Sequence, residues 1–167
     1  LLRELGLKVV ASSSAGVAGL IGLLADQPAR AEAELRWGYE ILDEIGDRNA
    51  LATIAAILAE ATFVQGRDEE TLALTELSAD AGAPEDMAIQ VQWRGPRAKA
   101  LARRGGELDA AEQLARDAVA LAEQSDFLDL HGNALMDLSE VLWIRGRSAE
   151  AAAAAESALA LFRRKGN

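Results

Sequence analysis

Several residue types that support particular folds and chemistries are scarce or absent in this chain of 167 residues. There is no cysteine, which excludes disulfides, thiolate zinc sites and cysteine nucleophiles. The single histidine excludes histidine-rich metal sites, and aromatic residues make up only 4% of the chain. Acidic residues outnumber basic ones by 27 to 17, and the resulting net charge of −10 argues against a general nucleic-acid binder.

Alanine and leucine dominate what is present, with 36 and 25 residues. Both are strong helix formers, whereas the β-branched and aromatic residues that are typical of strands are few. The length suits one domain with a buried core. The composition therefore predicts an all-α fold.

One segment raises the question of a membrane span. Residues 9–25 carry no charge, and this length lies at the lower limit for a spanning helix. Serines and glycines lower its mean hydropathy, and Glu4 lies where a signal peptide would be basic. We therefore expect a helix buried on several sides, in a cytoplasmic protein that makes no use of a membrane.

Because the chain opens on Leu1 and Leu2 rather than on Met, we expect it to be a piece of a longer protein.

An internal repeat of forty residues decides the expected fold. Turn residues that precede a helix start recur forty residues apart, at Asp26, Gly66, Gly106 and Gly146. Small side chains recur at three positions around these turns. They are Gly19, Ala59, Ala98 and Ser139, then Ala31, Thr71, Ala111 and Ala151, then Gly38, Ser78, Ala118 and Ala158. Small residues let helix axes approach closely, and helical pairs of constant period stack as a solenoid.

The pattern predicts a right-handed α-solenoid of four antiparallel helical hairpins in a single domain. Helix-end signals and apolar spacing place the helices at 8–24 with 28–45, 50–65 with 68–81, 86–104 with 109–124, and 127–145 with 149–165. The repeats span about 8–46, 50–82, 86–125 and 127–166. Pro96 lies inside the helix 86–104 and is expected to kink it. Asp109 and Glu112 have the spacing of a capping box.

The spacing of the small residues resembles that of the tetratricopeptide repeat (TPR). The fourth copy carries the pattern most fully, with Leu135, Leu138, Ser139, Leu142, Gly146, Ala151, Ala155 and Ala158. The usual unit of that family has about 34 residues, so a period of forty implies longer helices. HEAT repeats share the longer period and are the alternative.

Three longer strings are similar to the C-terminal helical arm of large bacterial signalling ATPases that carry a nucleotide-cyclase-like or LuxR-type head. The strings are 92–105, 108–122 and 125–138. The resemblance implies a sensor or scaffold arm that regulates such a head. The phosphate-binding loop motif of those ATPases does not occur in this sequence, so the resemblance implies no nucleotide binding here.

In TPR superhelices, the first helices of the hairpins line a concave face that binds partners. Carried over by position, the resemblance implies a binding face for a protein or peptide. It comprises Glu60, Phe63, Gln92, Arg94, Lys99, Arg103, Asn133, Met136, Glu140 and Trp143. Phe63 and Trp143 are candidates to anchor a bound peptide, and the alternative is that they fill space between hairpins.

The residues from Trp93 to Arg104 form a basic cluster in an otherwise acidic chain. One interpretation is a site for an acidic tail or a phosphate-bearing ligand. The alternative is internal pairing with Glu60, Asp137 and Glu140 on neighbouring helices, together with a Trp–Arg stack. The sequence leaves both open.

The expected function is that of a non-catalytic protein-interaction or scaffolding module. Catalytic carboxylate pairs, metal-ligand spacings and cofactor motifs cannot be picked out, so we expect neither enzymatic activity nor a cofactor nor a metal. The partner would be a protein, a peptide or another domain of the parent protein, and not nucleic acid. A receptor for a small ligand or signal peptide, and a structural self-association arm, are the alternatives. The sequence assigns no oligomeric state.

Overall fold

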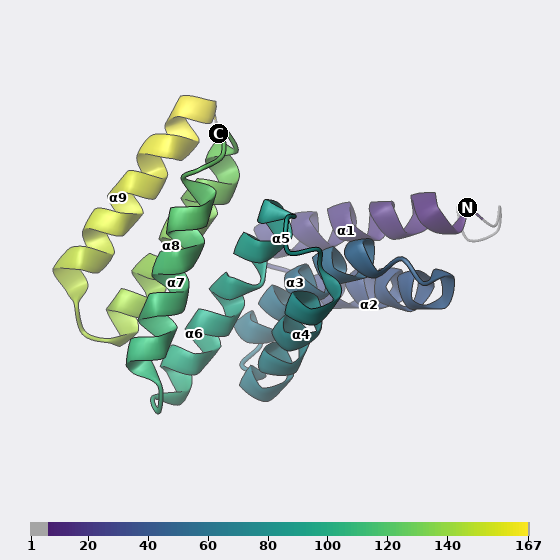
Figure 1. Ribbon diagram of the computed structural model, residues 1–167, viewed down its shortest axis with the longest axis horizontal. Helices are drawn as coiled ribbons and strands as arrows, with labels where there is room; N and C mark the ends of the chain where they lie inside the picture. The colour runs from purple at the N-terminus through teal and green to yellow at the C-terminus, as the bar shows by residue number, and fades with distance from the viewer. Residues whose placement is uncertain (1–6, 167) are drawn as a thin grey trace. The chain divides into compact units, whose positions relative to one another are not determined.

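The computed structural model describes residues 7–166, and all regular structure in this range is helical (Figure 1). The prediction of an all-α fold is therefore confirmed. The chain divides into two compact units, with the boundary between Ala83 and Pro84. That the hairpins of both units form one right-handed solenoid stays a prediction.

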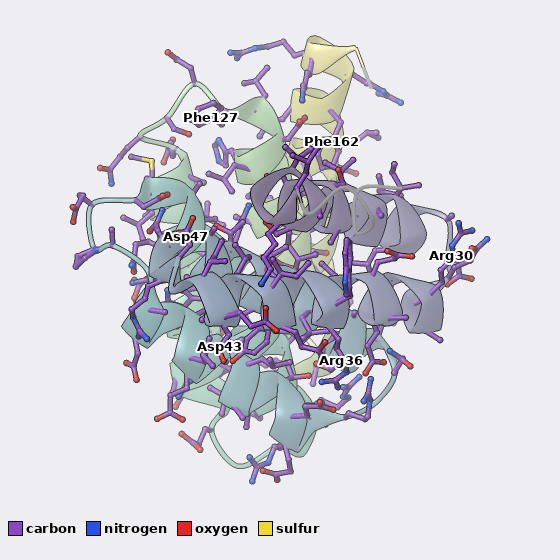
Figure 2. All side chains as sticks on the ribbon, turned by 90° about the vertical axis from the view of Figure 1, so that its right-hand side faces the viewer. Arg30, Arg36, Asp43, Asp47, Phe127 and Phe162 are labelled. Atoms are coloured by element: carbon purple, nitrogen blue, oxygen red, sulfur yellow. The ribbon has the colours of Figure 1, made fainter. Side chains whose placement is uncertain are left out.

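The first unit contains two helical hairpins. Its helices are α1 (Lys8–Leu24), α2 (Pro28–Ile45), α3 (Arg48–Val64) and α4 (Asp68–Ala81). Helix α1 packs on α2 and α3 packs on α4, while α2 also lies against α3. Charged side chains such as those of Arg30, Asp43 and Asp47 are exposed on this unit (Figure 2).

The second unit also pairs its helices in chain order. They are α5 (Met87–Gln92), α6 (Arg94–Arg104), α7 (Leu108–Ala122), α8 (Leu128–Ile144) and α9 (Ser148–Lys165). Helix α6 packs on α7 and α8 packs on α9, while α7 lies against α8. The two first helices, α6 and α8, are also in contact.

The helix expected at 86–104 is divided in two, and Pro96 explains where. Proline has no N–H to donate to the carbonyl of residue 92, and its ring clashes with the preceding turn. Helix α5 accordingly ends at Gln92, and Trp93 forms a turn before α6 begins at Arg94. The division places Pro96 in the first turn of α6, where a missing N–H costs nothing.

The small residues of the forty-residue repeat lie at helix contacts, as predicted. All of them are buried except Ser139, which is half-buried and donates a hydrogen bond to the carbonyl of Ala151 at 2.8 Å. A Cβ on Gly38 would lie 2.7 Å from the Cβ of Ala15, so α1 and α2 meet at this glycine. The hydroxyl of Ser78 donates to the carbonyl of Ala52 at 2.8 Å and joins α4 to α3.

Each unit has a thin core of aliphatic side chains between its helices. In the first unit the core cluster comprises Ala31, Leu35, Leu42, Leu51, Ile54, Ile57, Leu58 and Ala61. The main cluster of the second unit comprises Ala98, Ala102, Ala111, Ala115, Leu138, Val141, Leu142 and Ala151. Alanine is thus a principal core residue here, because it fills contacts that are too close for larger side chains.

The expectation that the apolar helix near the N-terminus is buried on several sides is wrong. Helix α1 buries one face, through small residues that include Ala11, Ala15 and Gly19. Its large apolar residues on the opposite side are exposed: Val10, Val17, Leu20, Ile21 and Leu24. Among the described residues, no helix combines the length and the apolar character that crossing a membrane requires.

Candidate functional site

Four of the residues proposed for partner binding share one face of α8, which we call the α8 surface. It consists of Asn133, Met136, Glu140 and Trp143, which follow one another at intervals of three or four residues. All four are exposed, and Trp143 leaves 68% of its surface open to solvent. Tryptophan is among the residues that most often carry the binding energy of protein interfaces.

Helix α6 approaches the neighbouring turn of α8 at Gly95. A Cβ on Gly95 would lie 2.0 Å from Oδ2 of Asp137, so a larger residue here would displace the Asp137 side chain. The carboxylate of Asp137 pairs with the ammonium group of Lys99 at 2.8 Å, and a carboxylate oxygen of Glu140 lies 3.9 Å from the same group. Lys99 is only 3% exposed. The interpretation of internal pairing is therefore correct for Lys99.

The rest of the basic cluster is divided between internal contacts and solvent. The guanidinium of Arg94 lies 4.3 Å from the ring centroid of Trp93, which confirms the Trp–Arg stack. Burial lowers the pKa of Arg94, and the charge of Asp117 opposes this effect. Oε1 of Gln92 is buried and has no hydrogen-bond partner among the described residues. Arg103, in the last turn of α6, is exposed.

The two predicted site residues of the first unit are less accessible. Phe63 is 3% exposed and fills space inside the structure, which is the alternative considered for it. Glu60 is half-buried. The α8 surface described here lies wholly within the second unit.

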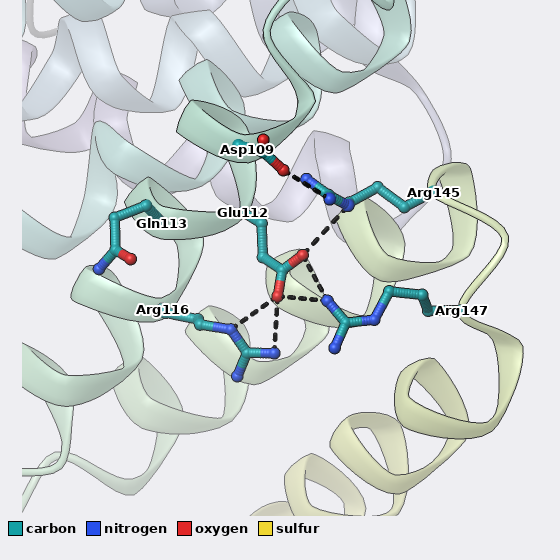
Figure 3. A pocket seen from close by; sticks show the side chains of 6 residues that line it. All are labelled: Asp109, Glu112, Gln113, Arg116, Arg145 and Arg147. Atoms are coloured by element: carbon teal, nitrogen blue, oxygen red, sulfur yellow. Dashed lines mark hydrogen bonds and ion pairs between the residues drawn. The ribbon is translucent and has the colours of Figure 1, made fainter.

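A second group of polar residues lines an open hollow of about 300 Å³ in the second unit (Figure 3). At its centre, the carboxylate of Glu112 on α7 accepts hydrogen bonds from Arg116 at 2.8 Å and from Arg147 at 2.6 Å. Arg145 reaches the same carboxylate at 3.1 Å and also binds Asp109 at 2.7 Å. Arg147 further pairs with Glu150 at 2.5 Å. The three arginines are thus matched by three carboxylates, so the group ties α7 to the α8–α9 turn.

The same group recurs in the first unit, at positions that are eighty residues earlier in the chain. Glu32, Arg36, Arg67 and Glu70 correspond to Glu112, Arg116, Arg147 and Glu150. Glu32 of α2 accepts hydrogen bonds from Arg36 at 2.8 Å and from Arg67 at the start of α4, while Arg36 also pairs with Glu70. We call each set of four a boundary quartet, because it joins the second helix of one hairpin to the turn of the next.

The boundary quartets were not predicted from the sequence, and part of one was assigned another role. Asp109 and Glu112 were expected to form a capping box, but the cap residue of α7 is Glu107 and makes no side-chain cap hydrogen bond. Both carboxylates are instead used by arginines of the following turn. The signal in the sequence is the recurrence of the four charges at eighty residues, which is twice the period of the small residues.

We expect the boundary quartet of the first unit to make the folded protein less stable in acid. Burial alone would raise the pKa of Glu32, but hydrogen bonds from Arg67, Gln65 and Arg36 outweigh it and lower the pKa to about 2. As the pH falls, the Glu32 carboxylate therefore becomes protonated at a higher pH in the unfolded chain than in the folded chain. The stabilisation is complete above about pH 4.5 and is lost as the pH falls towards 2.

Glu32→Gln is the variant that tests this pH dependence. We expect it to remove about 1 to 2 kcal/mol of unfolding free energy at pH 7 and to flatten the decline between pH 4.5 and 2. Urea titrations at several pH values measure both effects. Glu40→Gln is the matched control, because Glu40 is an exposed carboxylate on the same helix. Parallel pH curves for Glu32→Gln and the wild type would contradict the assignment.

Comparisons with known proteins do not assign the chain to a family. A scan of protein-family models gives no match, and neither does a search of curated proteins.

Proposed function

We propose that the chain is a TPR-like, non-catalytic interaction module that binds a protein or peptide on the α8 surface. The observation that carries the proposal is the pair Met136 and Trp143, two large apolar side chains that are exposed on one face of one helix. The forty-residue repeat of small, buried contact residues supports a continuous solenoid of four hairpins.

The α8 surface has the composition of a binding hot spot with a polar surround. Met136 and Trp143 are seven residues apart, which is about 10 Å along a helix axis. Asn133 and Glu140 on the same face offer an amide and a carboxylate for orienting polar contacts. Burying an exposed tryptophan side chain on binding releases a large apolar area from water.

The spacing of the two apolar residues favours a particular partner class. An amphipathic helix that repeats apolar residues every seven positions has its anchors at the same separation. We therefore propose that the partner presents such a helix, with a basic residue placed to meet Glu140. The resemblance to the arm of bacterial signalling ATPases supports the further proposal that this helix belongs to a regulator or to another domain of a larger signalling protein.

Selection of peptides from a display library of amphipathic helices tests the proposal. Peptides that bind the wild-type chain should lose at least about tenfold in affinity for Trp143→Ala, measured by fluorescence anisotropy. Phe127→Ala is the control, because Phe127 is also 68% exposed in the second unit but precedes α8 (Figure 2). Selected peptides that bind Trp143→Ala as tightly as the wild type would refute the α8 surface.

A further inference from the structure

None of the helices in the described range 7–166 covers the exposed apolar face of α1. Ile21 is 61% exposed, and Val10, Val17 and Leu24 lie exposed on the same side of the helix. These residues recur at intervals of three, four or seven, which is the pattern of a face that packs on another helix. The repeat itself indicates what kind of helix the face fits.

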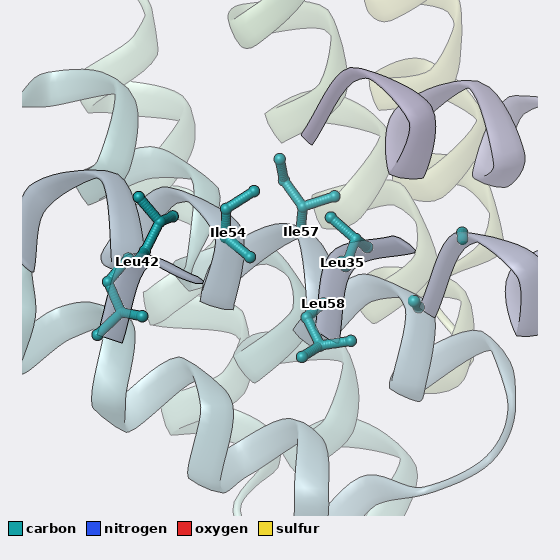
Figure 4. Packing of buried hydrophobic residues seen from close by; sticks show 8 residues of the cluster. Leu35, Leu42, Ile54, Ile57 and Leu58 are labelled. Carbon is teal, nitrogen blue, oxygen red and sulfur yellow. The ribbon is translucent and has the colours of Figure 1, made fainter. Parts of the chain in front are cut away.

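The position of Ile21 is buried wherever a hairpin precedes it within the same unit. Its counterparts are Ala61 on α3, forty residues later, and Val141 on α8, a hundred and twenty residues later, and both are fully buried. Ala61 belongs to the cluster that includes Ala31 and Leu35 of α2. Figure 4 labels Leu35 among the residues of this cluster. This position therefore faces the second helix of a preceding hairpin.

The second unit shows the same arrangement between α7 and α8. Val141 of α8 belongs to the cluster that includes Ala111 and Ala115 of α7. The chain thus forms one type of interface twice, between α2 and α3 and between α7 and α8. In both cases, small and medium apolar residues on the second helix of one hairpin pack against the first helix of the next hairpin.

The other half of such an interface is exposed on α9, the last second helix. Leu159 is 45% exposed. Its counterparts are Tyr39 on α2 and Val119 on α7, which pack against the clusters that join those helices to the next hairpin. Ala155 occupies the position of Leu35 and Ala115. The outer face of α9 therefore carries the apolar pattern that α3 and α8 receive.

Charges at the two exposed faces are complementary as well. Within the boundary quartets, Arg36 pairs with Glu70, and Arg116 lies 3.9 Å from Glu150. The counterpart of the two arginines on α9 is Glu156, and the counterpart of the two glutamates on α2 is Arg30. Both are exposed, and Arg30 points outward in Figure 2. Compared with the boundary quartets, both charges are reversed in sign, so Glu156 and Arg30 still attract each other.

We propose that the chain associates with a second copy of itself head to tail, with α9 of one copy packed on α1 of the next. The contact repeats the α2–α3 and α7–α8 interfaces, with Ala155 and Leu159 packed on the exposed apolar face of α1 and Glu156 paired with Arg30. Because it joins two different surfaces, the contact is heterologous and extends by further copies unless a ring closes. The α8 surface takes no part in it.

Sedimentation velocity of the full chain, between about 1 and 500 µM, tests the proposal. The wild type should form dimers and longer species as the concentration rises. Ile21→Glu should remain a monomer. Glu156→Arg should weaken association and raise the dissociation constant about tenfold at low salt. Arg30→Glu combined with Glu156→Arg restores the pair with its signs exchanged, and should restore association.

Two control variants separate this contact from general effects of charge or hydrophobicity. Glu40→Arg makes the same charge change as Glu156→Arg at another exposed position, and Phe127→Glu removes an exposed apolar side chain that belongs to neither α1 nor α9. Both should associate as the wild type does. A wild type that is monomeric throughout would overturn the proposal and assign the α1 face to another occupant. Association that Ile21→Glu abolishes but Glu156→Arg leaves unchanged would also overturn it, in favour of pairing between two α1 helices.

Discussion

Ala118→Trp is expected to abolish the cooperative unfolding of the second unit. Ala118 is fully buried on α7, in a cluster with Val91 of α5 and Ala134 of α8. An indole at this position forces three helices apart, and overpacking of a close contact costs about 3 kcal/mol or more. Thermal melts followed by circular dichroism, with a dye that binds exposed apolar surface, would measure the effect.

Ala120→Trp is the matched control for this substitution. Ala120 lies two residues further along α7 and is exposed, so the same side chain meets water there instead of a neighbouring helix. We expect its melting temperature to stay close to that of the wild type. If Ala118→Trp and Ala120→Trp melted alike, the assignment of position 118 to a close helix contact would be wrong.

Asp137→Ala is expected to destabilise the second unit by about 2 to 3 kcal/mol. The substitution removes the carboxylate that lies 2.8 Å from the ammonium group of Lys99. Lys99 is almost fully buried, so its charge would lose this compensation without gaining water. Urea denaturation at pH 7 would give the change in unfolding free energy.

The double variant Lys99→Met with Asp137→Ala separates the loss of the pair from the cost of an uncompensated charge. It removes both charges and keeps an apolar side chain of similar length, so we expect it to be more stable than Asp137→Ala alone. Glu140→Ala should cost less than about 0.5 kcal/mol, because Glu140 is half exposed and lies 3.9 Å from Lys99. A double variant as unstable as the sum of its single changes would contradict a coupled pair.

The repeat of small residues was a sound guide to the helix contacts. Ala31, Ala118 and Ala158 were assigned to close packing from their spacing, and all are buried. Helix bounds followed the turn residues closely, and α1 and α2 have the predicted ends. The break between α5 and α6 at Trp93 was predicted less accurately from the position of Pro96. A proline disrupts the helical turn that precedes it, so the break lies before the proline itself.

The candidate site was only partly predictable. The spacing correctly placed Asn133, Met136, Glu140 and Trp143 on one face, because helical periodicity alone groups them. It could not tell that Phe63 and Lys99 are buried, since the depth of a side chain depends on the neighbouring helices. The boundary quartets went unnoticed because they join residues about 35 positions apart that show no motif within a single helix.

The sequence by itself determined the helical character of the chain, the forty-residue period and the points where helices must meet. These properties depend on local propensity and on small side chains, which a linear pattern records directly. Only the tertiary structure decided which apolar faces are covered and which charges compensate one another. The face of α1, apolar in sequence like that of α3, is exposed because none of the described helices packs on it, and Lys99 is internal because α8 brings Asp137 to it.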